Sequence, residues 1–219
     1  MPTDQLLLFI AAGLLLNLTP GPDVLYVVSH ALRSGARAGM VAALGITAGC
    51  FVHIFAAAVG VSALMAASAT AFALLKWAGA AYLVYVGLRL LRPGPAAAMD
   101  LGAAPADVAQ PQDASAYRAI FLRGFWTNAL NPKVALFFLA FVPQFIAPEM
   151  ENKPLAFFLL GLLFNFNALW VNCAWAAVAA HAAGRSVRIQ RSMQWIDRLA
   201  GALFVGFGIK LALSAAPQA

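Results

Sequence analysis

The sequence predicts an all-α, polytopic membrane protein. Of its 219 residues, 63% are hydrophobic and 10% are charged, whereas a soluble domain carries about 25% charged residues. A membrane span needs about 20 mainly apolar residues, and six apolar runs meet this length: 5–31, 39–66, 70–91, 119–147, 155–181 and 196–214. The first and fourth runs are interrupted by proline. We therefore expect six transmembrane helices, two of them broken.

The first run contains the break Asn17-Leu18-Thr19-Pro20-Gly21-Pro22-Asp23. The residues before it carry no basic n-region, and no clean cleavage site of small residues follows, so we expect a first span rather than a removed signal peptide. Proline is tolerated in the first turn of a helix, and Thr19 is the predicted N-cap of a helix that restarts through Pro20, Gly21 and Pro22.

The second run places Gly45, Gly49 and His53 four residues apart, on one helix face. A Gly-x-x-x-Gly stripe favours close helix packing. His53 on this stripe is expected to face protein, and we favour a satisfied structural histidine over a proton relay. The third run, 70–91, completes a first three-helix half, residues 1–92.

The fourth run contains the second break, Asn128-Ala129-Leu130-Asn131-Pro132-Lys133. Asn131 is the predicted N-cap of the helix entered through Pro132. A helix that restarts inside the membrane presents free N–H groups and a positive dipole end, which suit an anion such as a carboxylate. Asn128 belongs to the same break and is a candidate site residue.

Each break carries one charge, Asp23 after the first and Lys133 after the second. An acid in the first turn of a helix is favoured by the dipole and a lysine is disfavoured, so an anionic companion is expected beside Lys133. Two interpretations of the pair stay open. In one, the pair joins the two halves permanently; in the other, it opens to hold an amine and a carboxylate, with Asp23 able to take a proton. The two do not exclude each other.

The fifth run, 155–181, carries Asn165 and Asn172 on one helix face. Interhelical hydrogen bonding explains them more simply than substrate contact does, so they are site candidates of second rank, with His53. The last run, 196–214, is rich in glycine, which predicts tight packing.

Basic residues set the expected orientation, because cytoplasmic loops are rich in Lys and Arg. Ten lie in or beside the loops 32–38, 92–118 and 182–195, against three (Lys76, Lys153 and Lys210) on the other side. These loops are therefore predicted to be cytoplasmic and both termini to lie outside. Residues 93–117 form a flexible linker before a second half, 118–219. Three spans per half imply an inverted repeat, which many secondary transporters share.

Several function classes are disfavoured. The net charge of +6 comes without an aromatic-basic motif, so we expect no nucleic-acid partner. Cys50 and Cys173 lie in apolar runs, no metal-ligand spacing is present, and nucleophile-elbow and zinc-protease motifs are absent. We predict a transporter without catalytic residues, metal or cofactor.

At these residues the chain resembles the LysE/RhtB family of amino-acid exporters. The matching segments are Leu18–Asp23, Gly45–Gly49 with His53, Leu75–Leu83, Asn131–Lys133, Phe137-Phe138, Pro143–Phe145 and Gly201–Gly206. The resemblance covers nearly the whole chain except 93–117 and part of the fifth run. It implies a bacterial inner-membrane exporter of amino acids or close derivatives that is coupled to the proton gradient, without naming the substrate. The alternative is efflux of another small solute such as a metal cation. A homodimer is compatible with the small-residue stripes.

Overall fold

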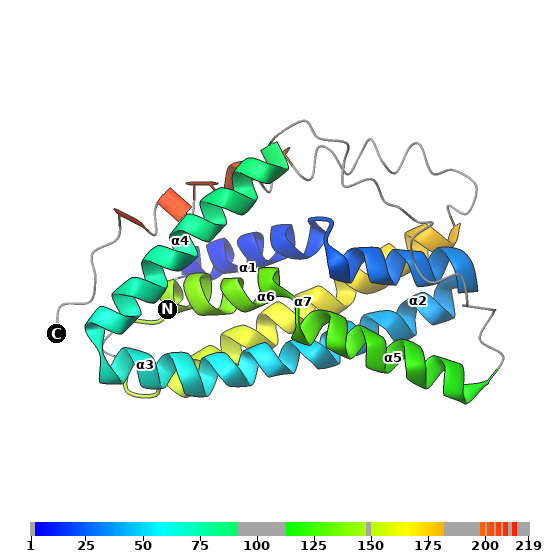
Figure 1. The fold of residues 1–219 in the computed structure, drawn as a ribbon, viewed down its shortest axis with the longest axis horizontal. Coiled ribbons are helices and arrows are strands. Elements are labelled where there is room, and N and C mark those ends of the chain that lie inside the picture. The colour runs from blue at the N-terminus through cyan, green and yellow to red at the C-terminus, as the bar shows by residue number, and fades with distance from the viewer. Residues whose placement is uncertain are drawn as a thin grey trace.

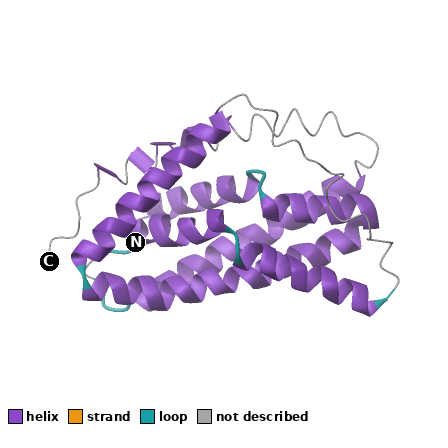
Figure 2. Ribbon diagram, viewed as in Figure 1, coloured by secondary structure: helices purple, strands orange, loops and turns teal. Residues whose placement is uncertain are grey.

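The computed structural model describes residues 3–91, 113–147 and 150–181, together with short helical pieces within 198–213. These parts are helical apart from short loops and turns, and no strand occurs among them (Figure 2). The predicted all-α class is confirmed. The helices are α1 (Thr3–Leu18), α2 (Pro22–Ala56), a π-helix (Ala57–Val61), α3 (Ser62–Ala67), α4 (Ala69–Leu91), α5 (Ala114–Ala129), α6 (Pro132–Leu136), a second π-helix (Phe137–Phe141), a 3-10 helix (Val142–Phe145) and α7 (Lys153–His181).

Both predicted breaks are present. Helix α1 ends at Leu18 and α2 begins at Pro22, and Figure 1 shows the start of α2 running on from the end of α1. Helix α5 ends at Ala129, and the helical stretch Pro132–Phe145 leaves it at an angle of 44°. Proline removes a helix hydrogen bond and clashes with the preceding turn, so each break lies where the sequence places proline.

Helix α2 doubles back at Gly35, which has φ 81° and ψ 175° (Figure 1). A β-carbon at Gly39 would lie 2.7 Å from the β-carbon of Ala31, although eight residues along a straight helix span about 12 Å. Only glycine adopts this backbone conformation at low cost. The predicted loop 32–38 is therefore a tight turn within α2 rather than an open loop.

Two helical stretches of the described residues are long and apolar enough to cross a membrane, Pro22–Met65 and Lys153–His181. The bent pair of α5 and Pro132–Phe145 adds a third if it is one span, and Thr3–Leu18 is a shorter apolar helix. These helices agree with a polytopic membrane protein. The predicted span 196–214 is described only in pieces, and most of the linker 93–117 lies outside the described residues. Its last residues open α5, which begins at Ala114.

The return arm of α2 packs closely on α5 through the predicted glycine stripe. A β-carbon at Gly45 would collide with the carbonyl oxygen of Phe121, and one at Gly49 with that of Phe125. A β-carbon at Gly124 of α5 would in turn lie 2.9 Å from the carbonyl oxygen of Ala42. Such contacts are typical of small-residue helix interfaces in membranes, and this contact fixes α5 beside α2.

Two buried apolar clusters form the core. The first is rich in phenylalanine and joins α1, the second break and α7 through Phe9, Phe137, Phe138, Phe141 and Phe164. The second is made of small and β-branched residues from α2, α5 and α7, such as Val27, Ala42 and Ala176. Both clusters contribute residues to the cavity described next.

Candidate functional site

The first break does not use the predicted cap. Thr19 continues the hydrogen bonding of α1, because its N–H donates to the carbonyl oxygen of Leu15 at 2.9 Å. Its hydroxyl donates to the same oxygen at 2.6 Å, as Ser and Thr hydroxyls often do in helices. The N-cap of α2 is Gly21, without a side-chain cap. The prediction that Thr19 caps α2 is therefore wrong.

The second break is capped as predicted. The Asn131 side-chain oxygen accepts a hydrogen bond from the backbone N–H of Lys133 at 3.0 Å. Pro132 has no N–H to give to the carbonyl oxygen of Asn128, its i−4 partner. That oxygen instead accepts from the backbone N–H of Asn131 at 2.8 Å and pairs with His53 Nε2 at 2.8 Å.

His53 must donate in this contact, because a carbonyl oxygen only accepts. The buried ring also lies parallel to that of Phe138, with centroids 6.2 Å apart. His53 thus faces protein, as the stripe predicts, and it replaces the donor that Pro132 removes from α5.

Lys133 makes the corresponding contact at the first break. Its ammonium donates to the carbonyl oxygens of Leu16 and Thr19, both at 3.1 Å. Pro20 cannot donate to Leu16, so the lysine supplies a hydrogen bond that the helix lacks. Cations are favoured at the C-terminal end of a helix and disfavoured at its N-terminal end. The favourable interaction of the Lys133 ammonium with the C-terminal end of α1 therefore offsets its unfavourable interaction with the N-terminal end of α6. A β-carbon at Gly21 would lie 3.1 Å from Lys133 Nζ, so glycine keeps this approach open.

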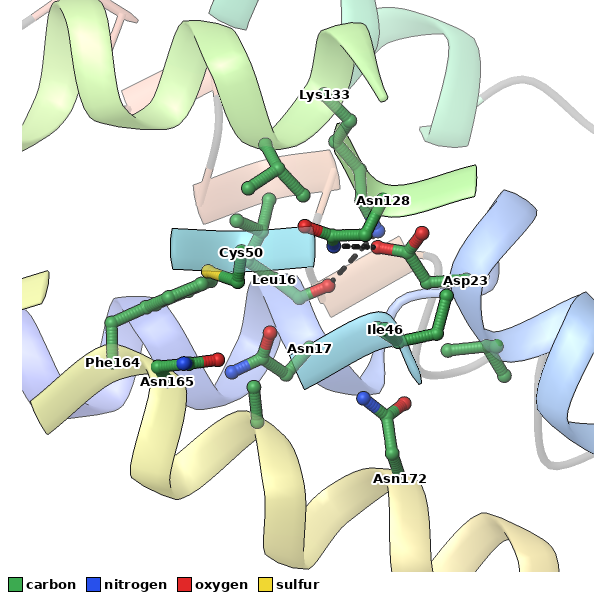
Figure 3. A pocket seen from close by; sticks show the side chains of 13 residues that line it. Leu16, Asn17, Asp23, Ile46, Cys50, Asn128, Lys133, Phe164, Asn165 and Asn172 are labelled. Atoms are coloured by element: carbon green, nitrogen blue, oxygen red, sulfur yellow. Dashed lines mark hydrogen bonds between the residues drawn. The ribbon is translucent and has the colours of Figure 1, made fainter. Parts of the chain in front are cut away.

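Asp23 lies in the first turn of α2, as predicted, and is 8% exposed. Its Oδ2 accepts a hydrogen bond from Asn128 Nδ2 at 2.9 Å (Figure 3). Its Oδ1 is buried and has no hydrogen-bond partner among the described residues. The positive charge of Lys133 lies within electrostatic range of the carboxylate. Residues 105 and 110 positions apart in sequence thus meet around one acid.

A cavity of about 20 Å³ lies between the two breaks and α7 (Figure 3). This volume holds about one water molecule, so an amino acid would enter only if the helices move apart. Its lining is Leu16, Asn17, Asp23, Val24, Ile46, Cys50, Asn128, Lys133, Val134, Phe164, Asn165, Ala168 and Asn172. The charged and amide groups of this set come from α1, α2, α5, α6 and α7.

The cavity brings together five predicted site residues, Asp23, Asn128, Lys133, Asn165 and Asn172. The others form or support the breaks. Thr19 and Asn131 bond to the backbone, His53 acts through Asn128, and Pro20, Gly21, Pro22 and Pro132 interrupt the helices.

Asn165 is 3% exposed, and its Nδ2 donates to the carbonyl oxygen of Thr47 at 3.1 Å. This is the interhelical bond that the simpler interpretation predicts. Asn17 lines the cavity but is absent from the predicted site residues. Its polarity directly after the apolar run Leu6–Leu16 was the available signal.

Sequence comparison adds the family. The profile of the LysE type translocator family matches residues 14–215, nearly the whole chain. The chain belongs to this family. A homoserine/homoserine lactone efflux protein of Salmonella typhimurium is 30% identical, over 93% of this chain and 94% of the relative. A leucine efflux protein of Salmonella choleraesuis is 28% identical, over 93% and 92%.

A membrane protein of Vibrio cholerae is 31% identical over 96% of this chain and 97% of its own. No solved structure matches the LysE-family chain. Membership confirms the resemblance inferred from the matching segments, and it makes the protein a membrane translocator rather than an enzyme.

Proposed function

We propose that this LysE-family protein is a secondary exporter of amino acids or close derivatives, with its substrate held between the two broken helices. The names of the efflux relatives support the substrate class. The cavity supports the place, because it combines one acid, one lysine and several amides in a small volume.

The observation that carries the proposal is the meeting of Asp23 and Lys133 in one cavity. A zwitterionic amino acid has one ammonium and one carboxylate. The cavity offers the Asp23 carboxylate for the ammonium and the Lys133 ammonium for the carboxylate. Asp23 Oδ1, which has no hydrogen-bond partner among the described residues, would accept from the substrate ammonium. Lys133 would turn from the α1 carbonyls toward the substrate carboxylate. Ionised residues inside membrane segments commonly mark such pathways.

Proton coupling is part of the proposal. When no substrate is bound, Asp23 would take a proton, and substrate and proton would compete for the same carboxylate. A protein that binds either the substrate or a proton can exchange one for the other across the membrane, because each of them favours its own conformation of the protein.

The proposed architecture is a six-span inverted repeat of the halves 1–92 and 118–219. After each break the described chain repeats one order: a helical arm, a reversal of direction, and a long apolar helix. We place the protein in the bacterial inner membrane, with both termini outside and the loops 32–38, 92–118 and 182–195 in the cytoplasm, as the basic residues favour. Discontinuous helices at a repeat interface commonly hold the substrate of secondary transporters.

The test is counterflow in proteoliposomes. The purified protein is reconstituted and given a panel of labelled amino acids, with and without an imposed pH gradient. We expect exchange of at least one amino acid, a dependence on the gradient, and loss of exchange in Asp23→Asn at unchanged reconstitution yield.

Normal exchange by Asp23→Asn would remove Asp23 from the mechanism. No exchange of any amino acid by the native protein, with increased resistance to metal salts in cells that express it, would favour cation efflux instead.

A further inference from the structure

The seam between α5 and the arm of α2 that precedes its turn gathers positive charge outside the cavity. Tyr26, His30 and Arg33 follow one another at intervals of four and three residues, so they share one face of this arm. That face lies against α5, because the Tyr26 hydroxyl donates to the carbonyl oxygen of Ile120 at 2.8 Å. The charge of Arg123, on α5, lies within electrostatic range of both Tyr26 and His30.

His30 is the buried member of this seam. It is 8% exposed, and its ring packs edge-on against that of Tyr26, with centroids 4.5 Å apart. Its Nδ1 is buried and has no hydrogen-bond partner among the described residues. A polar atom in this state costs free energy and indicates a ligand group or water that would bind it. Arg33 and Arg123 both lie within electrostatic range of the ring, so the ligand that suits the seam is an anion.

The described acids of these two helices lie away from the seam. Asp23 is seven residues before His30, about 10 Å along the helix, and it bonds to Asn128. Asp113 is the N-cap of α5, ten residues before Arg123 and about 15 Å away along the helix. The seam itself is therefore positively charged.

Arg123 lies on the exposed face of α5, beside the exposed apolar side chains Leu122, Trp126 and Leu130. It is five residues before Asn128 of the second break, about 7.5 Å along the helix. Discontinuous helices of secondary transporters meet near the bilayer midplane, and the hydrocarbon layer extends about 15 Å to either side. The backbone of Arg123 is thus expected inside the hydrocarbon layer. Arginine at that depth is costly unless it is paired or reaches the head groups.

We propose that this seam binds the phosphate head group of an anionic phospholipid from the cytoplasmic leaflet, with an acyl chain along Trp126 and Leu130. Arginine matches a phosphate through paired N–H donors. The two apolar side chains continue from Arg123 toward the second break, as an acyl chain continues from its head group. A free phosphate would use the arginines but not this apolar row. The inference rests on the proposed orientation and goes beyond the proposed export of amino acids.

Phosphatidylglycerol and phosphatidylcholine with identical acyl chains provide the test, because only the first carries a net negative charge. Native mass spectrometry measures their binding to the purified protein in a neutral detergent. We expect the native protein to bind phosphatidylglycerol at least tenfold more tightly. Arg123→Gln should weaken this binding about fivefold, which corresponds to about 1 kcal/mol, the usual contribution of one arginine near anionic lipid. Arg33→Gln combined with Arg123→Gln should bring the ratio of the two affinities toward one.

Arg89→Gln is the matched control. Arg89 is an exposed arginine of α4, and its guanidinium carbon lies 6.0 Å from the centroid of the Tyr85 ring, outside the seam. Because it lies in the same predicted leaflet, its loss removes an equal charge from that side of the protein. The preference for phosphatidylglycerol should remain.

A second measurement locates the lipid with all arginines in place. Trp126 and Trp170 are both exposed, on α5 and α7, but only Trp126 lies beside the proposed acyl chain. Phosphatidylglycerol brominated near the head-group end of its acyl chains should quench tryptophan fluorescence more than brominated phosphatidylcholine does. This excess should disappear in Trp126→Phe and persist in Trp170→Phe.

The outcomes that contradict the lipid site are distinct. Equal binding of the two lipids by the native protein, or a preference that the double arginine variant keeps, would overturn it. Displacement of phosphatidylglycerol by inorganic phosphate would indicate a site for a free anion and would overturn it as well. If an arginine variant is not recovered folded, the fluorescence comparison decides, and an excess that Trp126→Phe keeps would overturn the site. Neither measurement involves transport, so the exporter function is tested separately by counterflow.

Discussion

At the scale of single residues, Pro20 and Pro132 each leave one carbonyl oxygen without its usual i+4 donor, and each oxygen accepts a hydrogen bond from a side chain of another helix. Lys133 supplies Leu16 at the first break, and His53 supplies Asn128 at the second. These two carbonyl oxygens therefore have hydrogen-bond donors without water, as the membrane interior requires of backbone groups. At the first break this contact also places Lys133 beside the cavity.

The glycine stripe gives a prediction about stability at this scale. In Gly49→Ala the added methyl group collides with the Phe125 carbonyl oxygen, so α2 and α5 must separate. We expect a loss of about 1 to 3 kcal/mol, typical of overpacking, seen as a lower apparent melting temperature at a fixed heating rate. Gly60→Ala is the matched control, since a β-carbon there meets nothing within 4 Å. An equal melting temperature for the two variants would refute the close contact.

At the scale of elements, the second break is a bend of 44° between α5 and the stretch that follows it. The bend exists because Pro132 cannot bond to Asn128, and His53 of α2 holds the freed oxygen. The glycine contact and this hydrogen bond both join α2 to α5, as does the hydrogen bond from Asn128 to Asp23.

A double-mutant cycle measures that connection. Pro132→Ala restores an N–H that can reach the Asn128 oxygen, and His53→Phe removes the donor while keeping a ring beside Phe138. We expect His53→Phe to destabilise the native protein more than it destabilises Pro132→Ala, with a coupling of about 0.5 to 1 kcal/mol, the usual size of membrane hydrogen bonds.

Chemical denaturation in mixed micelles measures both costs. Identical costs in the two backgrounds would mean that His53 does not replace the missing N–H. Pro132→Ala should also exchange amino acids more slowly than the native protein, because a straighter helix withdraws Lys133 from the cavity.

At the scale of the whole molecule, sequence patterns predicted the all-α class, both breaks, the glycine stripe and the burial of Asp23, because proline, glycine and charge have strong local preferences. They misplaced the cap at the first break, since whether the Thr19 hydroxyl bonds backward or forward depends on where α1 ends. They also did not predict that Lys133 would bond to the carbonyl oxygens of α1. That contact joins residues 114 or more positions apart, and a local pattern carries no information about it.

Orientation is the prediction that belongs to this scale. Asp113 and Glu151 are exposed residues at opposite ends of the stretch formed by α5 and its bent continuation. In a background where Cys50 and Cys173 are alanine, Asp113→Cys should react with an impermeant maleimide only from the cytoplasmic side. Glu151→Cys should react only from outside. The reverse pattern in oriented vesicles would overturn the assignment from basic residues.

The most direct test of the cavity as the substrate site is calorimetric binding of a transported amino acid and two analogues, one without the amine and one with the carboxylate replaced by a neutral amide. We expect the native protein to bind the amino acid at least tenfold more tightly than either analogue. Asp23→Asn should lose the preference over the analogue without the amine and keep the other, and Lys133→Gln should do the opposite. Both preferences unchanged in both variants would contradict the account.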